Sequence, residues 1–299
     1  MHIRERLGSG ELCFSFEFFP PRTDKGVESL FQTVTELQPL EPGFVSVTYP
    51  GSATPAPDAD TARRRELTLA LTRRIREESG IEAMAHITCS AHTREELARI
   101  LDRLAAERAD NVLALRGDPP GESGFVVAEG GFAHAVQLIE LVREQGHGFS
   151  VGGACYPEKH QECVDLDLDI KHLKAKVDAG ADFLISQLFF DNRHWFAFLE
   201  KSRAAGIDVP IVPGLMPITS RDGIVRMTQL SGASIPDGLR RELDAHADDE
   251  DAIIEIGISH TTAQAIELLE SGAPGIHFYT LNKSRATRAI LGAIRRRLM

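Results

Sequence analysis

Three consecutive stretches decide the fold: the apolar run Glu82-Ala-Met-Ala-His-Ile-Thr88, an amphipathic segment over 94–108, and a second apolar run, Asn111-Val-Leu-Ala-Leu-Arg116. The two runs have the length and composition of buried strands. Thr93 precedes three charged residues, two of them acidic, as is typical of the start of a helix. A strand, a helix and a second strand in this order predict a βαβ unit with parallel strands.

The same alternation extends over all 299 residues. Strands are predicted at Leu12–Phe18, Phe44–Tyr49, Glu82–Thr88, Asn111–Arg116, Ser150–Cys155, Phe183–Phe189, Val209–Leu215 and Gly275–Tyr279. Helices are predicted near 25–37, 61–79, 94–108, 132–145, 170–179, 194–205, 220–231 and 285–298, with an extra helix near 251–271 before the last strand. This order predicts a (β/α)8 TIM barrel, a single domain over residues 1–299. An open doubly wound sheet ranks second, because no clear nucleotide-binding glycine turn is present.

Composition and charge exclude several classes of protein. Lysine and arginine number 33 and aspartate and glutamate 44, so the formal net charge is −11. We therefore expect no general nucleic-acid-binding surface, and an anionic ligand would need a local basic pocket. Four cysteines without a C-x-x-C pair are typical of a reduced cytoplasmic protein. Neither a signal peptide nor an apolar run of ~18–20 residues is found, so we expect neither secretion nor membrane insertion.

Three segments interrupt the alternation of strands and helices. The long loops Pro50–Asp60 and Gly117–Gly131 each follow a predicted strand. Loops in this position form the catalytic face of a barrel. The segment Ser231–Glu250 is polar and acidic, and we expect it to lie outside the core.

Polar residues stand at the carboxyl ends of nearly all the predicted strands. They are Glu17, Thr48, His86 with Thr88, Arg116 with Asp118, Tyr156, Gln187, and Tyr279 with Asn282. Any one of them is explained by a local hydrogen bond. Because the strand ends of a barrel converge, the set as a whole predicts a functional site.

Glu17 is the sharpest candidate in this set. It stands in Phe14-Ser-Phe-Glu-Phe-Phe19, where a period of two turns the phenylalanines toward the helices and Glu17 toward the barrel interior. Burial favours the protonated form of a carboxyl group, which suits a general acid near neutral pH. A structural role, with Glu17 paired to Arg22 or Arg116, fits the sequence equally well.

The other candidates leave two interpretations open. Asp118 follows Gly117, whose lack of a side chain allows close approach to a flat ligand, but Asp118 also fits a turn before two prolines. Gln187 can meet the donors and acceptors of a heterocycle or bond within the barrel. Asp169, His172 and Lys176 share one helix face and, with His160 on the preceding loop, either hold a phosphate-bearing cofactor or form a solvated surface.

The sequence motifs of several classes of enzyme are absent. The chain has no G-x-x-x-x-G-K-[ST], G-x-G-x-x-G, H-E-x-x-H or G-x-S-x-G sequence, and we expect no metal site. No lysine occupies a predicted strand end, which disfavours a Schiff-base aldolase. Lys283, just past the last strand, comes closest.

Nine segments, in order along the chain, resemble methylenetetrahydrofolate reductase. They are Phe14–Thr23, Phe44–Tyr49, Ala85–Cys89, Leu113–Asp118, Tyr156–His160, Lys176–Asp182, Gln187–Asp191, Pro213–Pro217 and His277–Asn282. The resemblance implies a flavin-binding barrel with FAD as cofactor. It also implies reduction of 5,10-methylenetetrahydrofolate to 5-methyltetrahydrofolate, with hydride from NAD(P)H passing through the flavin. A homo-oligomer is expected.

The resemblance also implies roles for individual residues. Glu17 is the general acid that helps to open the folate ring, and Asp118 lies near the flavin and meets the pterin. FAD-binding positions are Thr48, His86, Arg116, Gly117, Asp118, Tyr156, His160, Asp169, His172 and Lys176. Substrate-binding positions are Gln187, Tyr279 and Lys283.

The chain departs from the family pattern at several positions. Pro50–Pro57 replaces a glycine-rich stretch, Arg221 stands where some members carry an aromatic residue, and Ala175 and Lys283 stand where some carry arginine. The barrel fills the chain, so we expect no appended regulatory domain. Two alternatives stay open: another flavin-dependent barrel oxidoreductase, such as an amino-acid dehydrogenase, or a lyase or binding barrel that has lost the flavin.

Overall fold

The computed structural model of the protein describes residues 1–52, 57–117, 125 and 127–298. One parallel sheet runs through it in the order β7-β6-β5-β4-β3-β2-β1-β9-β8. Its strands are β1 (Cys13–Phe18), β2 (Phe44–Val47), β3 (Ala83–Thr88), β4 (Asn111–Leu115), β5 (Ser150–Cys155), β6 (Phe183–Ser186), β7 (Ile211–Val212), β8 (Gly214–Leu215) and β9 (Gly275–Tyr279).

The sheet closes into a barrel at a division of the seventh predicted strand. β7 pairs with β6 and β8 pairs with β9, while Pro213 alone separates β7 from β8. Proline has no N–H to donate to a neighbouring strand, but its carbonyl oxygen accepts the His277 N–H at 2.9 Å. The predicted (β/α)8 barrel is confirmed, and the open doubly wound sheet is wrong. The expected strand Val209–Leu215 is shorter and split.

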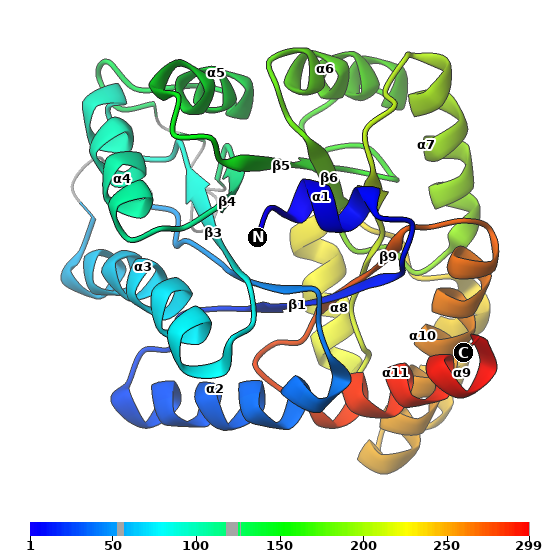
Figure 1. Cartoon of the computed structure of the whole chain (residues 1–299). Coiled ribbons are helices and arrows are strands. Elements are labelled where there is room, and N and C mark those ends of the chain that lie inside the picture. The colour runs from blue at the N-terminus through cyan, green and yellow to red at the C-terminus, as the bar shows by residue number, and fades with distance from the viewer. Residues whose placement is uncertain (53–56, 118–124, 126, 299) are drawn as a thin grey trace.

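Helices surround the barrel on all sides (Figure 1). They are α1 (Ile3–Gly8), α2 (Asp24–Leu37), α3 (Ala59–Ser79), α4 (Arg94–Ala106), α5 (Ala135–Gln145), α6 (Leu166–Asp178), α7 (Asn192–Ala204), α8 (Arg221–Ser231), α9 (Asp237–Ala245), α10 (Glu250–Glu270) and α11 (Arg285–Leu298), with a 3-10 turn η1 (Gln38–Leu40). The predicted cap of α4 is present, because the Thr93 hydroxyl oxygen accepts the Glu96 N–H at 3.2 Å. None of the helices in these ranges combines the length and apolar character that crossing a membrane requires.

The side chains on the two faces of β1 point in the predicted directions. Phe14, Phe16 and Phe18 are buried in the large apolar cluster that includes residues of the surrounding helices. Glu17, between the last two, faces the inside and lines a cavity there. The period-two interpretation of this strand is therefore confirmed.

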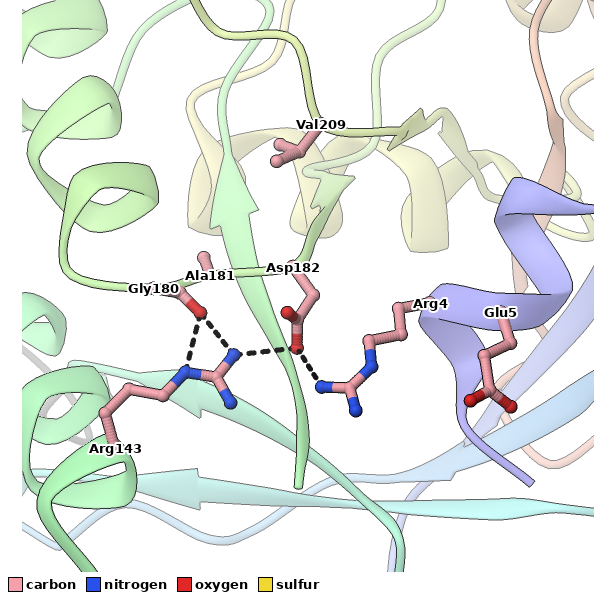
Figure 2. Close-up of a pocket in the computed structure, with 7 residues that line it drawn as sticks. All are labelled: Arg4, Glu5, Arg143, Gly180, Ala181, Asp182 and Val209. Carbon is pink, nitrogen blue, oxygen red and sulfur yellow. Dashed lines mark hydrogen bonds and ion pairs between the residues drawn. The ribbon is translucent and has the colours of Figure 1, made fainter. Parts of the chain in front are cut away.

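The amino ends of the strands carry a polar network. α1 lies across this end (Figure 1), and its Ile3 and Arg4 N–H groups donate to Asn111 Oδ1 at 2.8 Å and Ser150 Oγ at 3.1 Å. Beside it lies a hollow of about 540 Å³, in which the Asp182 carboxylate contacts Arg143 at 2.7 Å and Arg4 at 3.5 Å (Figure 2). Because these groups already pair with one another, and because this end of a barrel supports stability, we assign the hollow a structural role.

One expectation about the fold is wrong in part. The segment 231–250, expected outside the core, contains α9, and its Leu239 and Leu243 are buried. They belong to an apolar cluster with Ile235 and Met216. The acidic composition of the segment describes the exposed face of this helix and hides its apolar stripe.

We call the place where the barrel closes, between β7 and β8, the closing seam. Gly214 is predicted to be required there. A Cβ atom there would lie 2.3 Å from the Ser186 carbonyl oxygen and 2.7 Å from the Tyr279 hydroxyl. Gly214→Ala should therefore lower the free energy of unfolding by about 1–3 kcal/mol, the usual cost of overpacking, as measured by urea denaturation. The control is Gly238→Ala in α9, where nothing lies within 4 Å. Equal stabilities of the two variants would contradict this account of the seam.

Candidate active site

A cavity of about 800 Å³ lies at the carboxyl ends of the strands. Predicted site residues that line it are Glu17, Thr48, His86, Arg116, Gly117, Tyr156, His160, His172, Lys176, Gln187 and Tyr279. Asp169 is buried beside His160, whereas Lys283 is exposed and does not line the cavity. Asp118 lies outside the described residues. The structure thus brings together most of the side chains singled out at the strand ends.

Glu17 lies between two histidines. Its Oε2 atom is 3.5 Å from Nε2 of His86 on β3 and 3.5 Å from Nε2 of His277 on β9. The arginines considered as partners contact other acids: Arg22 pairs with Asp60 at 3.6 Å, and Arg116 donates to Glu162 at 2.9 Å. The Glu17 side chain is 19% exposed and lines the cavity. These contacts favour a chemical role for Glu17 over an arginine salt bridge.

Two buried polar atoms in the cavity wall lack a hydrogen-bond partner among the described residues. They are His86 Nε2 and Thr88 Oγ1, both on β3. Burial lowers the pKa of His86 to about 4, although the Glu17 carboxylate opposes this shift. The imidazole is therefore neutral near pH 7. Unpaired buried polar atoms are costly, so their position in a cavity wall indicates a place for a polar ligand.

Gly117 follows β4 and closes this part of the wall. Its φ angle is +85°, which favours glycine. An added Cβ would lie 2.8 Å from the Thr88 Cβ atom and 3.0 Å from that of Ser90. A side chain at this position would therefore displace the end of β3 from the cavity.

Gln187 and Tyr279 occupy the opposite wall, at the closing seam. The Tyr279 hydroxyl donates to the Ser186 carbonyl oxygen at 2.6 Å, and burial raises its pKa well above the usual value. Gln187 Oε1 accepts the Leu188 N–H at 2.9 Å. The amide oxygen of Gln187 is thus fixed by its own strand end, which leaves its NH2 group to donate to a ligand.

A group of lysine and histidine side chains lies near β5 and α6. Lys176 Nζ donates to the Ala154 carbonyl oxygen at 2.7 Å, and burial lowers its pKa while the Asp169 carboxylate opposes the shift. Asp169 also accepts the His160 N–H at 2.9 Å. His172 is exposed one turn before Lys176 on the same wall. Of the trio predicted on one helix face, Lys176 and His172 therefore line the cavity, whereas Asp169 is buried behind them.

One group of potential metal ligands was not anticipated from the sequence. Ligand atoms of Cys163, Asp169 and His172 all lie within 4.8 Å of one another. Thiolate, carboxylate and imidazole together suit a divalent transition metal. The Lys176 ammonium, which interacts with Asp169, opposes a second cation here. Lys176 is instead suited to a ligand that carries negative charge.

Sequence reasoning also missed the residues that fix the loops above β2 and β3. The buried Arg65 of α3 donates to the Pro50 and Ser90 carbonyl oxygens, each at 3.1 Å. Tyr49 lines the cavity, and its hydroxyl is 3.1 Å from His92 Nε2. An arginine in a charged helical segment gives no sequence signal for burial, so only the structure reveals this anchor.

The departures noted in the sequence have distinct placements. Ala175 lines the cavity, where an arginine would add charge. Arg221, at the start of α8, donates to Asp244 at 2.7 Å and does not line the cavity. Residues 53–56 of the divergent loop lie outside the described ranges.

The family model "Methylenetetrahydrofolate reductase" matches residues 2–295, a range that includes all the strands of the barrel. The chain belongs to the methylenetetrahydrofolate reductase family. The resemblance inferred from the nine segments is therefore confirmed. The matched range includes every strand whose end contributes to the cavity.

Relatives in this family differ in length. "Methylenetetrahydrofolate reductase (NADH) 1" of Zea mays is 36% identical over 300 residues, which cover 97% of this chain and 49% of that protein. "5,10-methylenetetrahydrofolate reductase" of Pectobacterium carotovorum subsp. carotovorum is 34% identical over 281 residues, 94% of this chain and 89% of that protein. The chain thus spans about half the length of the plant relative and most of the bacterial one.

Solved structures share the family's barrel at lower identity. An uncharacterised protein from Clostridium thermocellum, solved with two copies of 5-methyl-5,6,7,8-tetrahydrofolic acid, has a TM-score of 0.66 and 16% identity. The alignment covers 99% of this chain and 98% of that one. A 2,3-dimethylmalate lyase has a TM-score of 0.55 and 11% identity, with 98% and 84% covered. These likenesses show the fold alone.

His92 gives a pH dependence that can be measured. Burial lowers its pKa to about 4, whereas an unfolded histidine has a pKa of about 6.5. The unfolded chain therefore binds the proton first, and stability present above pH 6.5 is lost as the pH falls toward 4. Between pH 7 and pH 5, the free energy of unfolding should fall by roughly 1–2 kcal/mol less in His92→Gln than in the parent. Urea denaturation at both pH values measures this difference.

The matched control is His246→Gln, which changes an exposed histidine. Its pH dependence should follow that of the parent. If His92→Gln also follows the parent, the assignment of a neutral, buried His92 is wrong.

Proposed function

We propose that the protein reduces 5,10-methylenetetrahydrofolate to 5-methyltetrahydrofolate, with hydride from NAD(P)H passing through bound FAD. The observation that carries the proposal is the Glu17 carboxyl group, which lies between two imidazoles in the cavity of a family-member barrel. The barrel over residues 1–299 then acts as one flavin-binding domain. We further propose a cytoplasmic location and a homo-oligomeric state.

The residues present fit FAD. A cavity of about 800 Å³ is within the usual range for ligands of this size. The unpaired His86 Nε2 and Thr88 Oγ1 atoms suit the polar edge of a flat heterocycle. Lys176, His172 and His160 suit the diphosphate, which needs local cations in a chain of net charge −11. Thr48, Arg116, Gly117 and Tyr156 complete the wall, and Asp169 orients the His160 backbone.

Bound flavin supplies the hydride chemistry that no amino-acid side chain provides. The protein supplies the proton and the orientation. Glu17 donates a proton to the amine nitrogen that leaves the one-carbon unit when the folate ring opens. The Gln187 NH2 group and the Tyr279 ring orient the substrate on the opposite wall. Lys283 and Asp118 are proposed to bind the folate from outside the described wall.

Relatives support the choice of substrates. The Zea mays relative is named for NADH, whereas "Probable methylenetetrahydrofolate reductase (NADPH)" of Caenorhabditis elegans is 34% identical. Both names specify the same folate chemistry with different donors, so we propose NAD(P)H without choosing between them. The Clostridium thermocellum structure contains the product folate in a barrel of this fold.

Anaerobic half-reactions test the proposal. The purified protein should be yellow, its flavin should be bleached by NADH or NADPH, and methylenetetrahydrofolate should restore the colour. A colourless protein that takes up no FAD would indicate a barrel that has lost the flavin. Bleaching without folate-dependent recovery would indicate another flavin oxidoreductase.

Glu17→Gln should separate the two half-reactions. Flavin reduction by NAD(P)H needs no acid from the protein, so its rate should be near that of the parent. Folate-dependent reoxidation should fall by about 10²–10⁴-fold, the usual contribution of a general acid. Stopped-flow absorbance of the flavin measures both rates. An equal loss in both would make Glu17 a structural residue or a flavin contact.

Lys176→Met should weaken FAD binding by about tenfold or more, because a charge-assisted hydrogen bond is lost. The loss should be larger at low salt, where the attraction of opposite charges is less screened. Flavin fluorescence on dilution measures the affinity, and far-UV circular dichroism checks the fold. The control is Lys174→Met on the same helix, since Lys174 pairs with Asp178 and does not line the cavity. Equal affinities in the two variants at both salt concentrations would exclude a role for Lys176.

A further inference from the structure

A cluster of buried polar side chains lies behind Glu17, on the inner wall of the barrel. In the register of the sheet, Ser15 of β1 pairs with His277 of β9, and Glu17 pairs with Ser46 of β2. Ser15, Ser46 and His277 are all 0% exposed. None of these three residues touches the cavity. The proposed function gives them no task.

Ser15 determines the tautomer of His277. The Ser15 Oγ atom is 2.7 Å from His277 Nδ1, and this nitrogen is its only hydrogen-bond partner among the described residues. A buried O–H group without an acceptor is costly, so the hydroxyl donates to Nδ1. A neutral imidazole that accepts at Nδ1 carries its proton on Nε2.

The Nε2 atom of His277 lies near both Glu17 and Ser46. Nε2 lies 3.5 Å from Glu17 Oε2 and 3.4 Å from Ser46 Oγ. The Phe44 ring stacks on the imidazole at 5.8 Å between centroids, which fixes the plane of the ring. These polar contacts are long, as catalytic hydrogen bonds often are before substrate is bound.

We propose that His277, with its tautomer fixed by Ser15, is a positioning residue that stabilises the Glu17 carboxylate formed when the proton leaves. The inference rests on the proposed function, in which Glu17 is the acid. A hydrogen bond donated to a carboxyl group favours its ionised form. It therefore offsets the apolar surroundings of β1 and makes proton donation by Glu17 easier.

Two ionisable groups that face Glu17 have shifted pKa values. Burial keeps the pKa of His86, on β3, at about 4, and the pKa of Tyr279, on β9, is well above its usual value. In the described part of the chain, no lysine or arginine forms an ion pair with Glu17. The effect of a substitution at His277 should therefore be seen in the titration of Glu17.

Four variants test the proposal: His277→Leu, His277→Gln, Ser15→Ala and, as the matched control, Ser46→Ala. The rate of folate-dependent flavin reoxidation is measured against pH in each. Infrared titration of the Glu17 carboxyl, assigned by its absence in Glu17→Gln, gives a readout that needs no turnover. Flavin reduction by NAD(P)H should be near that of the parent throughout.

Removing the donor should weaken the acid. In His277→Leu the plateau rate at low pH should fall, and the pH at which the rate is half-maximal should rise by roughly one unit. Ser15→Ala should raise the pH of the half-maximal rate by a smaller amount, since the hydrogen bond that favours this tautomer is lost. His277→Gln keeps an N–H group at this place and should restore most of the parental profile. Ser46→Ala leaves the tautomer unchanged and should show no rise.

Each outcome decides the question. A rate that falls equally at every pH, with an unmoved carboxyl titration, would show that His277 and Ser15 are only structural. If His277→Leu fails to fold, the Ser15→Ala and Ser46→Ala pair decides, and equal profiles in the pair would overturn the proposal. Absence of folate-dependent reoxidation in the parent would instead contradict the proposed function, while the infrared titration still tests the hydrogen bond.

Discussion

The Gly214 N–H donates to the Ser186 hydroxyl at 2.9 Å, and the Tyr279 hydroxyl donates to the Ser186 carbonyl oxygen at 2.6 Å. These two hydrogen bonds join β8 and β9 to the end of β6, across the division of the seventh strand. Because Tyr279 pairs with Glu17 in the register of β9 and β1, the same seam determines how far Glu17 lies from Gln187. Closure of the barrel therefore also holds Glu17 and Gln187 in the same cavity, since a sheet left open here would separate them.

Most of the fold could be predicted from the sequence, because parallel strands buried on both faces are short apolar runs and the helices between them are amphipathic. The exceptions have physical causes. α1 has six residues, too few for a periodic pattern. Pro213 divides a strand whose sequence is apolar on both sides. In α9 the buried leucines 239 and 243 stand among charged residues, so composition over twenty residues conceals a helix.

The candidate site could be predicted where it depends on strand ends, since a barrel brings these together whatever their spacing in the chain. Contacts between side chains were harder to predict from the sequence. The sequence suggested only Arg22 or Arg116 as a partner of Glu17 and gave no sign of the two histidines near it, because the pairing with His277 depends on register. Arg65 gave no signal, because a buried arginine and a solvated one look alike in a charged helix. Lys283, predicted to bind substrate, lies outside the cavity wall.

The four cysteines differ in a way that has a practical use. Cys13, Cys89 and Cys155 are buried, and burial raises the pKa of the first two to about 11 and 12. Cys163 is not buried and lines the cavity. An alkylating reagent added to the folded protein will therefore react first at a single thiol in the wall of the site. Whatever fills the cavity shields that thiol, so the labelling rate, followed by mass spectrometry, reports occupancy even for ligands without colour.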